Sequence, residues 1–138
     1  MKILLVDDEP FHIQWIADNL HDEGYEVDFA RDVESALSAL KRETYRLLLV
    51  DLNIPVFGVY EENARSRGDI YLTFPGLLVA FEARNSGYRS KQVALYSAHK
   101  EGAVQDVATT LGIEYIVKQD PKRLMREIND VLAFDPTK

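Results

Sequence analysis

The sequence predicts a doubly wound α/β domain, in which a five-stranded parallel sheet of order 2-1-3-4-5 is covered by helices on both faces. The first observation is a set of short apolar runs, because strands buried on both faces are continuously apolar. The second is helical periodicity between these runs. The third is spacing. The strands begin near residues 3, 25, 47, 93 and 115, so three of the four intervals span 22 residues and hold one strand–helix unit each.

The first two units follow this pattern closely. A strand at residues 3–6 precedes a helix that begins near Pro10, since proline suits the first helical position. The apolar residues of this helix share one face, formed by Ile13, Ile16, Ala17 and Leu20. An alternating strand at residues 25–30 precedes a helix capped by Asp32. The second helix has its apolar residues at helical spacing, at Val33, Ala36, Leu37 and Leu40.

The last three units are predicted in the same way. The strand at residues 47–50 is followed, after a long interval, by a helix that contains Leu77, Leu78 and Phe81 and ends near Gly87. The strand at residues 93–96 is followed by a helix that ends at Gly112 and contains Val104, Val107, Ala108 and Leu111. After the strand at residues 115–117, Asp120 and Pro121 are typical of an N-cap and first position, and they precede Leu124, Ile128 and Val131.

The long third interval contains an insertion at about residues 57–74. Its outer pieces, VFGVY and DIYLTF, are rich in β-branched and aromatic residues, and they flank the polar stretch EENARSRG. This composition favours a β-hairpin flap. An irregular excursion along the edge of the sheet is the alternative.

Size and composition limit the classes of function. The 138 residues suit one domain, residues 1–138. The net charge of −7 argues against direct nucleic-acid binding, which needs clustered Lys and Arg. Without cysteine the chain has no disulfide framework and no thiolate metal site. No apolar run approaches the roughly 18 residues of a membrane span, and MKILLVDDEP lacks the pattern of a signal peptide. A cytoplasmic protein without membrane contact is therefore predicted.

Polar side chains follow four of the predicted strands at their carboxyl ends, where open parallel sheets bind ligands. Strands one and three are neighbours in the predicted order, so their acids would meet. Two carboxylates about 5 Å apart repel by roughly 3 kcal/mol at an effective dielectric near 20, and a hard cation such as Mg²⁺ removes that repulsion. An aspartate can also be a nucleophile toward phosphorus, with a lysine and a hydroxyl holding phosphoryl oxygens. The residues concerned are Asp7, Asp8, Glu9, Asp51, Ser97 and Lys118.

Each of these residues also has a plain structural interpretation. The acids at residues 7–9 suit a helix start, and Asp51 suits a strand-end turn. Ser97 could cap the fourth helix, and an isolated lysine is usually a surface residue. Because these residues occur together after four different apolar runs, a shared binding site is favoured over separate structural roles.

At these residues the sequence resembles the receiver domain of two-component response regulators. The matching pieces are ILLVDDEP, LLLVDLNIP, VALYSA and IEYIVK, and they span almost the whole chain in the order of that family. The resemblance implies a flavodoxin-like (βα)5 fold. It also implies a phosphoprotein of phosphorelay signal transduction, which accepts a phosphoryl group on one aspartate and switches partner binding.

The resemblance also implies roles for individual residues. Asp51 would be the phosphoacceptor, and Ser97 and Lys118 would hold phosphate oxygens. Mg²⁺ would be bound by Asp8, by Asp51 and by the backbone carbonyl of Asn53, with Asp7 acting through water. Ser97 and Tyr115 would be the switch residues, with Ser97 moving toward the phosphoryl group and Tyr115 turning inward.

The implied partners are a sensor histidine kinase or histidine phosphotransfer protein and a downstream output protein or domain. A homodimer through the face of the fourth helix, fifth strand and fifth helix is also implied. We expect no enzyme in the ordinary sense, since the protein would catalyse only its own phosphorylation and dephosphorylation. The sequence leaves open whether the receiver stands alone or is part of a longer protein.

Two positions depart from the family pattern. Gln119 follows Lys118 where the family usually has a proline with a cis peptide, and a cis bond before Gln would cost about 2.5–4 kcal/mol. We therefore expect a trans bond with an altered loop or a strained cis bond. The family's helix-opening glycine lies about eight residues after the acceptor, whereas Gly76 lies 76 − 51 = 25 residues after Asp51. The excess of about 17 residues matches the insertion, which we expect to shield the site or contact a partner.

Other functions on the same sheet fit less well. A receiver-like interaction module that is not controlled by phosphorylation is the main alternative, and Gln119 and the insertion leave room for it. A haloacid-dehalogenase-type phosphatase would need an aspartate where Asn53 stands. A flavodoxin would need a Ser/Thr/Gly-rich loop after strand one, where this chain is acidic. Neither G-x-G-x-x-G nor a P-loop motif occurs.

Overall fold

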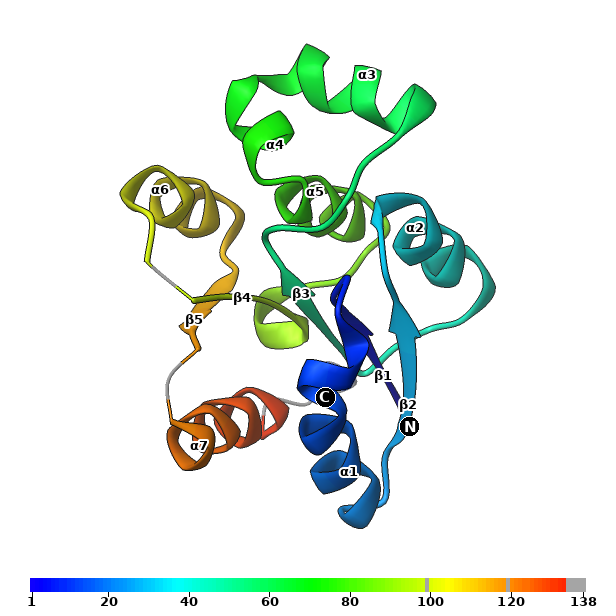
Figure 1. The fold of residues 1–138 in the computed structure, drawn as a ribbon, viewed down its shortest axis with the longest axis vertical. Helices are drawn as coiled ribbons and strands as arrows, with labels where there is room; N and C mark the ends of the chain where they lie inside the picture. The colour runs from blue at the N-terminus through cyan, green and yellow to red at the C-terminus, as the bar shows by residue number, and fades with distance from the viewer. Residues whose placement is uncertain (99, 119, 134–138) are drawn as a thin grey trace.

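The computed structural model describes residues 1–98, 100–118 and 120–133. These residues form a sheet of five parallel strands in the order β2-β1-β3-β4-β5, which confirms the predicted topology (Figure 1). The strands are β1 (Lys2–Val6), β2 (Glu26–Ala30), β3 (Leu47–Asp51), β4 (Val93–Ser97) and β5 (Glu114–Val117). Their carboxyl ends lie at one edge of the sheet, because every pair is parallel.

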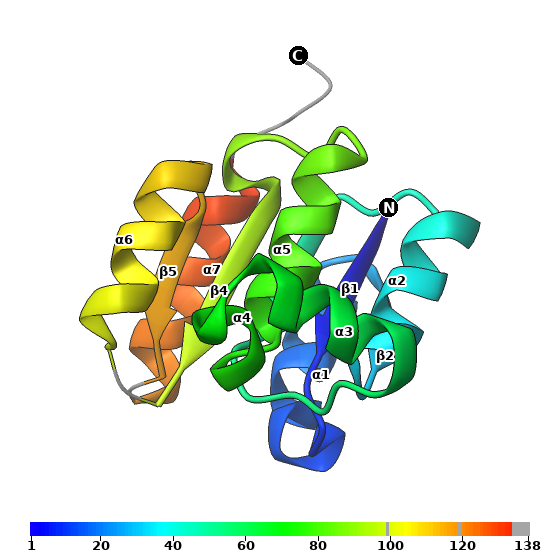
Figure 2. The same ribbon diagram turned by 90° about the horizontal axis from the view of Figure 1, so that it is seen from above.

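Helices cover both faces of the sheet (Figures 1 and 2). On one face lie the 3₁₀ turn η1 (Pro10–Ile13), α1 (Gln14–Asp22) and α7 (Pro121–Leu132). On the other lie α2 (Val33–Arg42), α5 (Gly76–Asn85) and α6 (Gly102–Leu111). A short 3₁₀ turn, η2 (Ser90–Gln92), leads into β4. None of the helices in the described ranges is long and apolar enough to cross a membrane, and the cytoplasmic location stays a prediction.

Two apolar cores follow from the alternation of side chains along each strand. In β1, Ile3 and Leu5 pack on the side of α1 and α7, whereas Leu4 and Val6 pack on the side of α2, α5 and α6. All four side chains are fully buried. The continuous apolar runs therefore correspond to strands that are covered on both faces, as predicted.

Local signals set the helix boundaries. Asp32 caps α2 by accepting a 2.7 Å hydrogen bond from the Ser35 N–H, and the Ser35 hydroxyl accepts one from the Asp32 N–H in return. Asp120 caps α7 by accepting from the Arg123 N–H at 3.1 Å. Gly112 ends α6 in the left-handed conformation, at φ 69°. These predictions are confirmed, whereas Pro10 opens a 3₁₀ turn and the α-helix itself begins at Gln14.

The insertion is helical, so the predicted β-hairpin is wrong, and so is the irregular excursion. It forms α3 (Gly58–Arg67) and α4 (Asp69–Thr73), separated by Gly68 at φ 141°. Good helix formers in the polar stretch and the ion pairs of Arg65 with Glu61 and Glu62 support α3.

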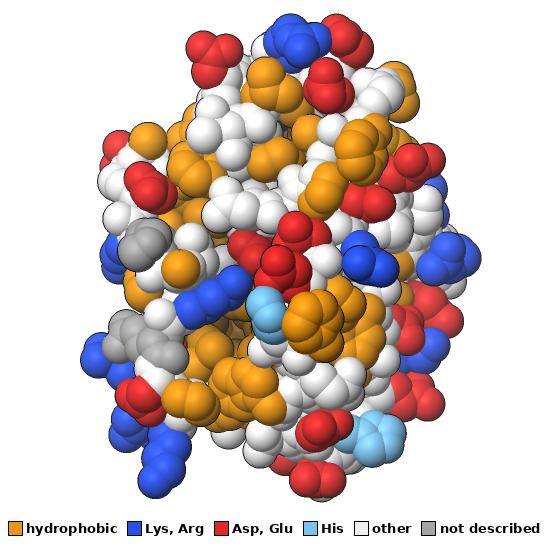
Figure 3. All heavy atoms as spheres, in the orientation of Figure 1, with side chains coloured by type: hydrophobic (Ala, Val, Ile, Leu, Met, Phe, Trp, Pro, Cys, Tyr) orange, Lys and Arg blue, Asp and Glu red, His pale blue; other side chains and the backbone are white. Residues whose placement is uncertain are grey.

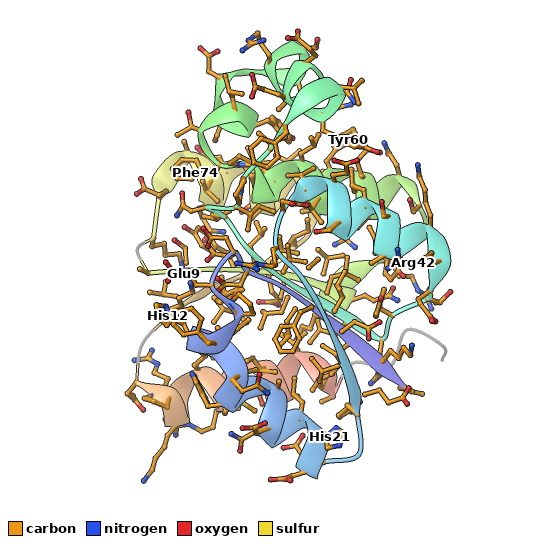
Figure 4. All side chains as sticks on the ribbon, turned by 45° about the vertical axis from the view of Figure 1, so that its right-hand side comes forward. Glu9, His12, His21, Arg42, Tyr60 and Phe74 are labelled. Atoms are coloured by element: carbon orange, nitrogen blue, oxygen red, sulfur yellow. The ribbon has the colours of Figure 1, made fainter. Side chains whose placement is uncertain are left out.

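Tertiary packing decides the conformation of the aromatic pieces. Ala64 is fully buried, and Tyr60, Ile70, Tyr71, Leu72 and Phe74 pack against the core on the side of α2 and α5. Tyr60 and Phe74 lie between the insertion and the domain beneath it (Figure 4). The guanidinium of Arg67 lies 3.4 Å from the ring centre of Phe81 on α5. The aromatic residues that suggested strands therefore serve as the buried side of two short helices.

Candidate functional site

Three carboxylates meet at the carboxyl ends of β1 and β3. These strands are neighbours, with Val6 in register with Val50, so the acids that follow them lie side by side. One oxygen each of Asp7, Asp8 and Asp51 lies within 4.8 Å of the others. Asp7 and Asp51 are buried and Asp8 is half-buried. Acidic side chains accordingly gather at the centre of the face in Figure 3.

Asp51 is held by hydrogen bonds to both of its oxygens. Oδ1 accepts from the N–H of Asn53 at 3.0 Å, and Oδ2 accepts from Nζ of Lys118 at 3.1 Å. Burial raises the pKa of Asp51, and the charge of Asp7 raises it further, whereas Asn53 and Lys118 lower it. Because burial is the largest of these effects, the pKa of Asp51 is above its ordinary value.

Asp7 is anchored by a residue that the sequence analysis did not single out. Its Oδ1 accepts from the Glu9 N–H at 2.9 Å, and its Oδ2 accepts from the hydroxyl of Tyr96. Tyr96 is fully buried on β4, in register with Asp51. Burial, and then the charge of Asp7, raise the pKa of Tyr96 well above its ordinary value. The signal in the sequence that could have pointed to Tyr96 is its place at the end of an apolar run, directly before Ser97.

Lys118 reaches the acids from the end of β5. Its Nζ lies 3.1 Å from Asp51 Oδ2, 3.8 Å from Asp7 Oδ2 and 4.4 Å from the ring centre of Tyr96. Its N–H donates to the carbonyl of Ser97 at 2.7 Å, which joins the ends of β4 and β5. The lysine therefore faces both buried carboxylates, and the predicted meeting of Lys118 with Asp51 is confirmed. The peptide between Lys118 and Gln119 lies outside the described residues.

Ser97 and Tyr115 lie on the strands beside the acids. Ser97 is the buried last residue of β4, and it does not cap the following helix, because α6 begins at Gly102 with Glu101 as its N-cap. Tyr115 is half-buried on β5, and its hydroxyl accepts from the Glu101 N–H at 3.1 Å. The hydrogen bond joins β5 to the start of α6, and the switching role of the two residues stays a prediction.

Gly76 follows the insertion and contacts the backbone just after β3. Its N–H donates to the carbonyl of Leu52 at 3.0 Å. A Cβ at this position would lie 2.2 Å from the carbonyl oxygen of Asp51 and 2.8 Å from Cα of Leu52. Only glycine allows α5 to approach this closely to the backbone of Asp51 and Leu52.

The acids open into a groove of about 490 Å³ that runs between the amino-terminal part of α1 and the start of α7. Its walls include Glu9 and His12, which lie next to each other (Figure 4) and form a 2.5 Å ion pair if His12 is protonated. Trp15 and Leu124 form an apolar side. None of the described residues of the insertion lines this groove. The expected shielding of the site is thus not supported.

The donor set of this site fits a hard divalent cation. Three carboxylates with oxygens within 4.8 Å of one another offer the anionic oxygen ligands that Mg²⁺ prefers, and Asn53 lines the same groove. The half-buried Lys118, whose ammonium lies beside Asp51, adds a positive group for an anion. The arrangement can therefore hold a cation and a phosphoryl group next to one buried carboxylate.

Comparison with known proteins agrees with this geometry. The family model of the response regulator receiver domain matches residues 3–58. The sensor histidine kinase RcsC of Escherichia coli is 35% identical over 83 residues, which cover 60% of this chain and 9% of the kinase. An uncharacterised 14.6 kDa protein of Leptolyngbya boryana is 31% identical over 141 residues. The match covers 99% of this chain and 94% of that protein.

Among solved structures, the response regulator TrrA of Thermotoga maritima, crystallised with Mg²⁺ and a beryllium fluoride, superposes with a TM-score of 0.68. It is 26% identical, and the match covers 94% of this chain and 97% of TrrA.

Proposed function

Because this chain belongs to the response regulator receiver family of two-component signalling, we propose that it accepts a phosphoryl group on Asp51 in a Mg²⁺-dependent reaction. The observation that carries the proposal is the surroundings of Asp51. Its carboxylate is buried at the end of β3, within 4.8 Å of oxygens of Asp7 and Asp8 and 3.1 Å from Lys118 Nζ. A buried aspartate that faces two acids and one lysine suits phosphoryl transfer better than it suits a structural role.

The chain's own groups support a nucleophilic reaction. A carboxylate oxygen of Asp51 forms the new O–P bond while the P–N bond of a phosphohistidine breaks, and the leaving imidazole keeps the electron pair and takes a proton from solvent. Lys118 neutralises charge on the transferred oxygens, and the Ser97 hydroxyl donates to one of them. The Asn53 N–H holds the second oxygen of Asp51 in place. When bound, Mg²⁺ would be held by Asp8, Asp51 and the carbonyl of Asn53, with Asp7 nearby, and would offset the remaining negative charge.

The donor in this proposal is a sensor histidine kinase or a histidine phosphotransfer protein. The similarity to a segment of the kinase RcsC supports such a partner. A downstream protein or domain would respond through the face formed by α6, β5 and α7, where Tyr115 joins β5 to Glu101 ahead of α6. The same face would serve a homodimer. No external metabolite is turned over, and the chain catalyses only its own phosphorylation and dephosphorylation.

The test is labelling by a small phosphodonor. We expect phosphoramidate with Mg²⁺ to phosphorylate the wild type, and we expect Asp51→Asn or removal of Mg²⁺ by a chelator to abolish labelling. Asp106→Asn is the matched control, because Asp106 is an exposed acid on α6. Labelling is read by mass spectrometry of the intact protein. A folded wild type that binds Mg²⁺ but takes no label would contradict the proposal and favour an interaction module that is not controlled by phosphorylation.

A further inference from the structure

Tyr96 contacts the acidic site in two ways that no other described tyrosine shares. Its hydroxyl donates to Oδ2 of Asp7, and its ring lies 4.4 Å below Nζ of Lys118. It stands on β4 in register with Asp51, and its side chain is fully buried. The tyrosine therefore touches one of the acids and the lysine at the same time.

Lys118 lies near two carboxylates, and one of them is hydrogen-bonded to Tyr96. Nζ of Lys118 is 3.1 Å from Asp51 Oδ2 and 3.8 Å from Asp7 Oδ2, so both acids compete for one ammonium. The oxygen of Asp7 that faces Lys118 is the one that accepts from Tyr96. That oxygen therefore already has a donor in Tyr96, and Lys118 lies closer to Asp51, over the aromatic ring of Tyr96.

We propose that Tyr96 is a positioning residue that fixes Asp7 for cation binding and keeps Lys118 on Asp51. The inference rests on the proposed function, because it assigns a role in the same site. The phenol O–H of Tyr96 is the donor in this hydrogen bond to Asp7. Without this hydrogen bond, the buried carboxylate of Asp7 turns to Lys118. The resulting ion pair weakens the attraction of Asp7 for a cation and draws the lysine away from Asp51.

Tyr96→Phe tests this role, because it removes the hydroxyl and keeps the ring. Tyr45→Phe is the matched control, since Tyr45 is equally buried and its hydroxyl donates at 2.8 Å to another carboxylate, Asp28, on β2 away from the site. The dissociation constant of Mg²⁺ is measured from amide chemical shifts, and the phosphorylation rate is measured with phosphoramidate. Thermal unfolding of both variants reports the loss of stability that any buried hydroxyl causes.

We expect Tyr96→Phe to raise the dissociation constant of Mg²⁺ about tenfold, the usual effect of removing a partner of a metal ligand, and to slow labelling by a similar factor. Tyr45→Phe should lose thermal stability but bind Mg²⁺ and take up phosphate as the wild type does. The inference is overturned if the Mg²⁺ dissociation constant and the labelling rate of Tyr96→Phe stay within twofold of the wild type. It is also overturned if both are impaired equally in Tyr45→Phe.

The wild type provides a measurement that does not depend on how the variant folds. Ring signals of Tyr96 should shift during a Mg²⁺ titration, whereas those of Tyr45 should not, and an unmoved Tyr96 overturns the inference. A wild type that neither binds Mg²⁺ nor takes label refutes the proposed function and this inference together. A labelled wild type with an unimpaired Tyr96→Phe variant refutes the inference alone.

Discussion

Replacing Asp51 by Asn should stabilise the protein when Mg²⁺ is absent. Asp51 has one oxygen within 4.8 Å of oxygens of both Asp7 and Asp8, and each such pair repels by about 3.5 kcal/mol at an effective dielectric near 20. The attraction of Lys118 at 3.1 Å offsets about 5 kcal/mol of this. The repulsion and the attraction leave the ionised Asp51 at a net cost of about 1–2 kcal/mol. Burial, the largest cause of the raised pKa of its carboxyl, adds to this cost.

The Asn side chain removes this charge and keeps the surrounding contacts. Its amide oxygen can still accept from the Asn53 N–H, and Lys118 keeps Asp7 at 3.8 Å as a partner. We expect the midpoint of thermal unfolding to rise by about 4 °C for each kcal/mol in a domain of this size. Asp106→Asn, at an exposed site, should change the free energy of unfolding by less than about 0.5 kcal/mol.

The stability gained by Asp51→Asn should increase as the pH rises, because the pKa of Asp51 is raised in the folded protein. Above the pKa of folded Asp51, the ionised carboxylate destabilises the wild type in full. Below the ordinary pKa of about 3.9, both the folded and the unfolded wild type hold the proton, and the gain vanishes. Unfolding is followed by circular dichroism in chelator at about pH 7.5 and about pH 5. An Asn variant no more stable than the wild type at the higher pH would refute the reasoning.

Three further predictions concern Gly76, the insertion and Arg84. Gly76→Ala should lose about 1–3 kcal/mol of stability and slow labelling, because its Cβ would lie 2.2 Å from the Asp51 carbonyl oxygen. Gly102→Ala, with no atom within 4 Å of the added Cβ, should alter neither chemical denaturation nor labelling. Replacing residues 59–73 by a short Gly/Ser linker should leave the labelling rate within about twofold, since they do not line the groove, and a tenfold change would disprove this. Arg84→Ala should lower stability by about 2–4 kcal/mol in urea unfolding, because the guanidinium donates to three backbone carbonyls, and an unchanged midpoint would contradict this.

The elements of the sheet could be predicted because their signals are local. Apolar runs and caps such as Asp32 act within a few residues, and a parallel sheet then brings the carboxyl ends of strands together. The meeting of Asp7, Asp8 and Asp51 with Lys118 follows from that rule, and the distances confirm it. The insertion could not be predicted, because its aromatic residues suit a strand or the buried side of a helix equally well until the surface of α5 is present.

The sequence by itself determined the order of the strands, the position of each polar residue at the carboxyl edge and the resemblance to receiver domains, since periodicity and spacing are properties of the chain. Tertiary structure alone decided that the insertion is helical and lies away from the acidic groove. It also decided that Tyr96, the last residue of an apolar run, points its hydroxyl at Asp7. The physical reason is that both outcomes depend on contacts between residues far apart in the chain, 89 positions apart for Tyr96 and Asp7.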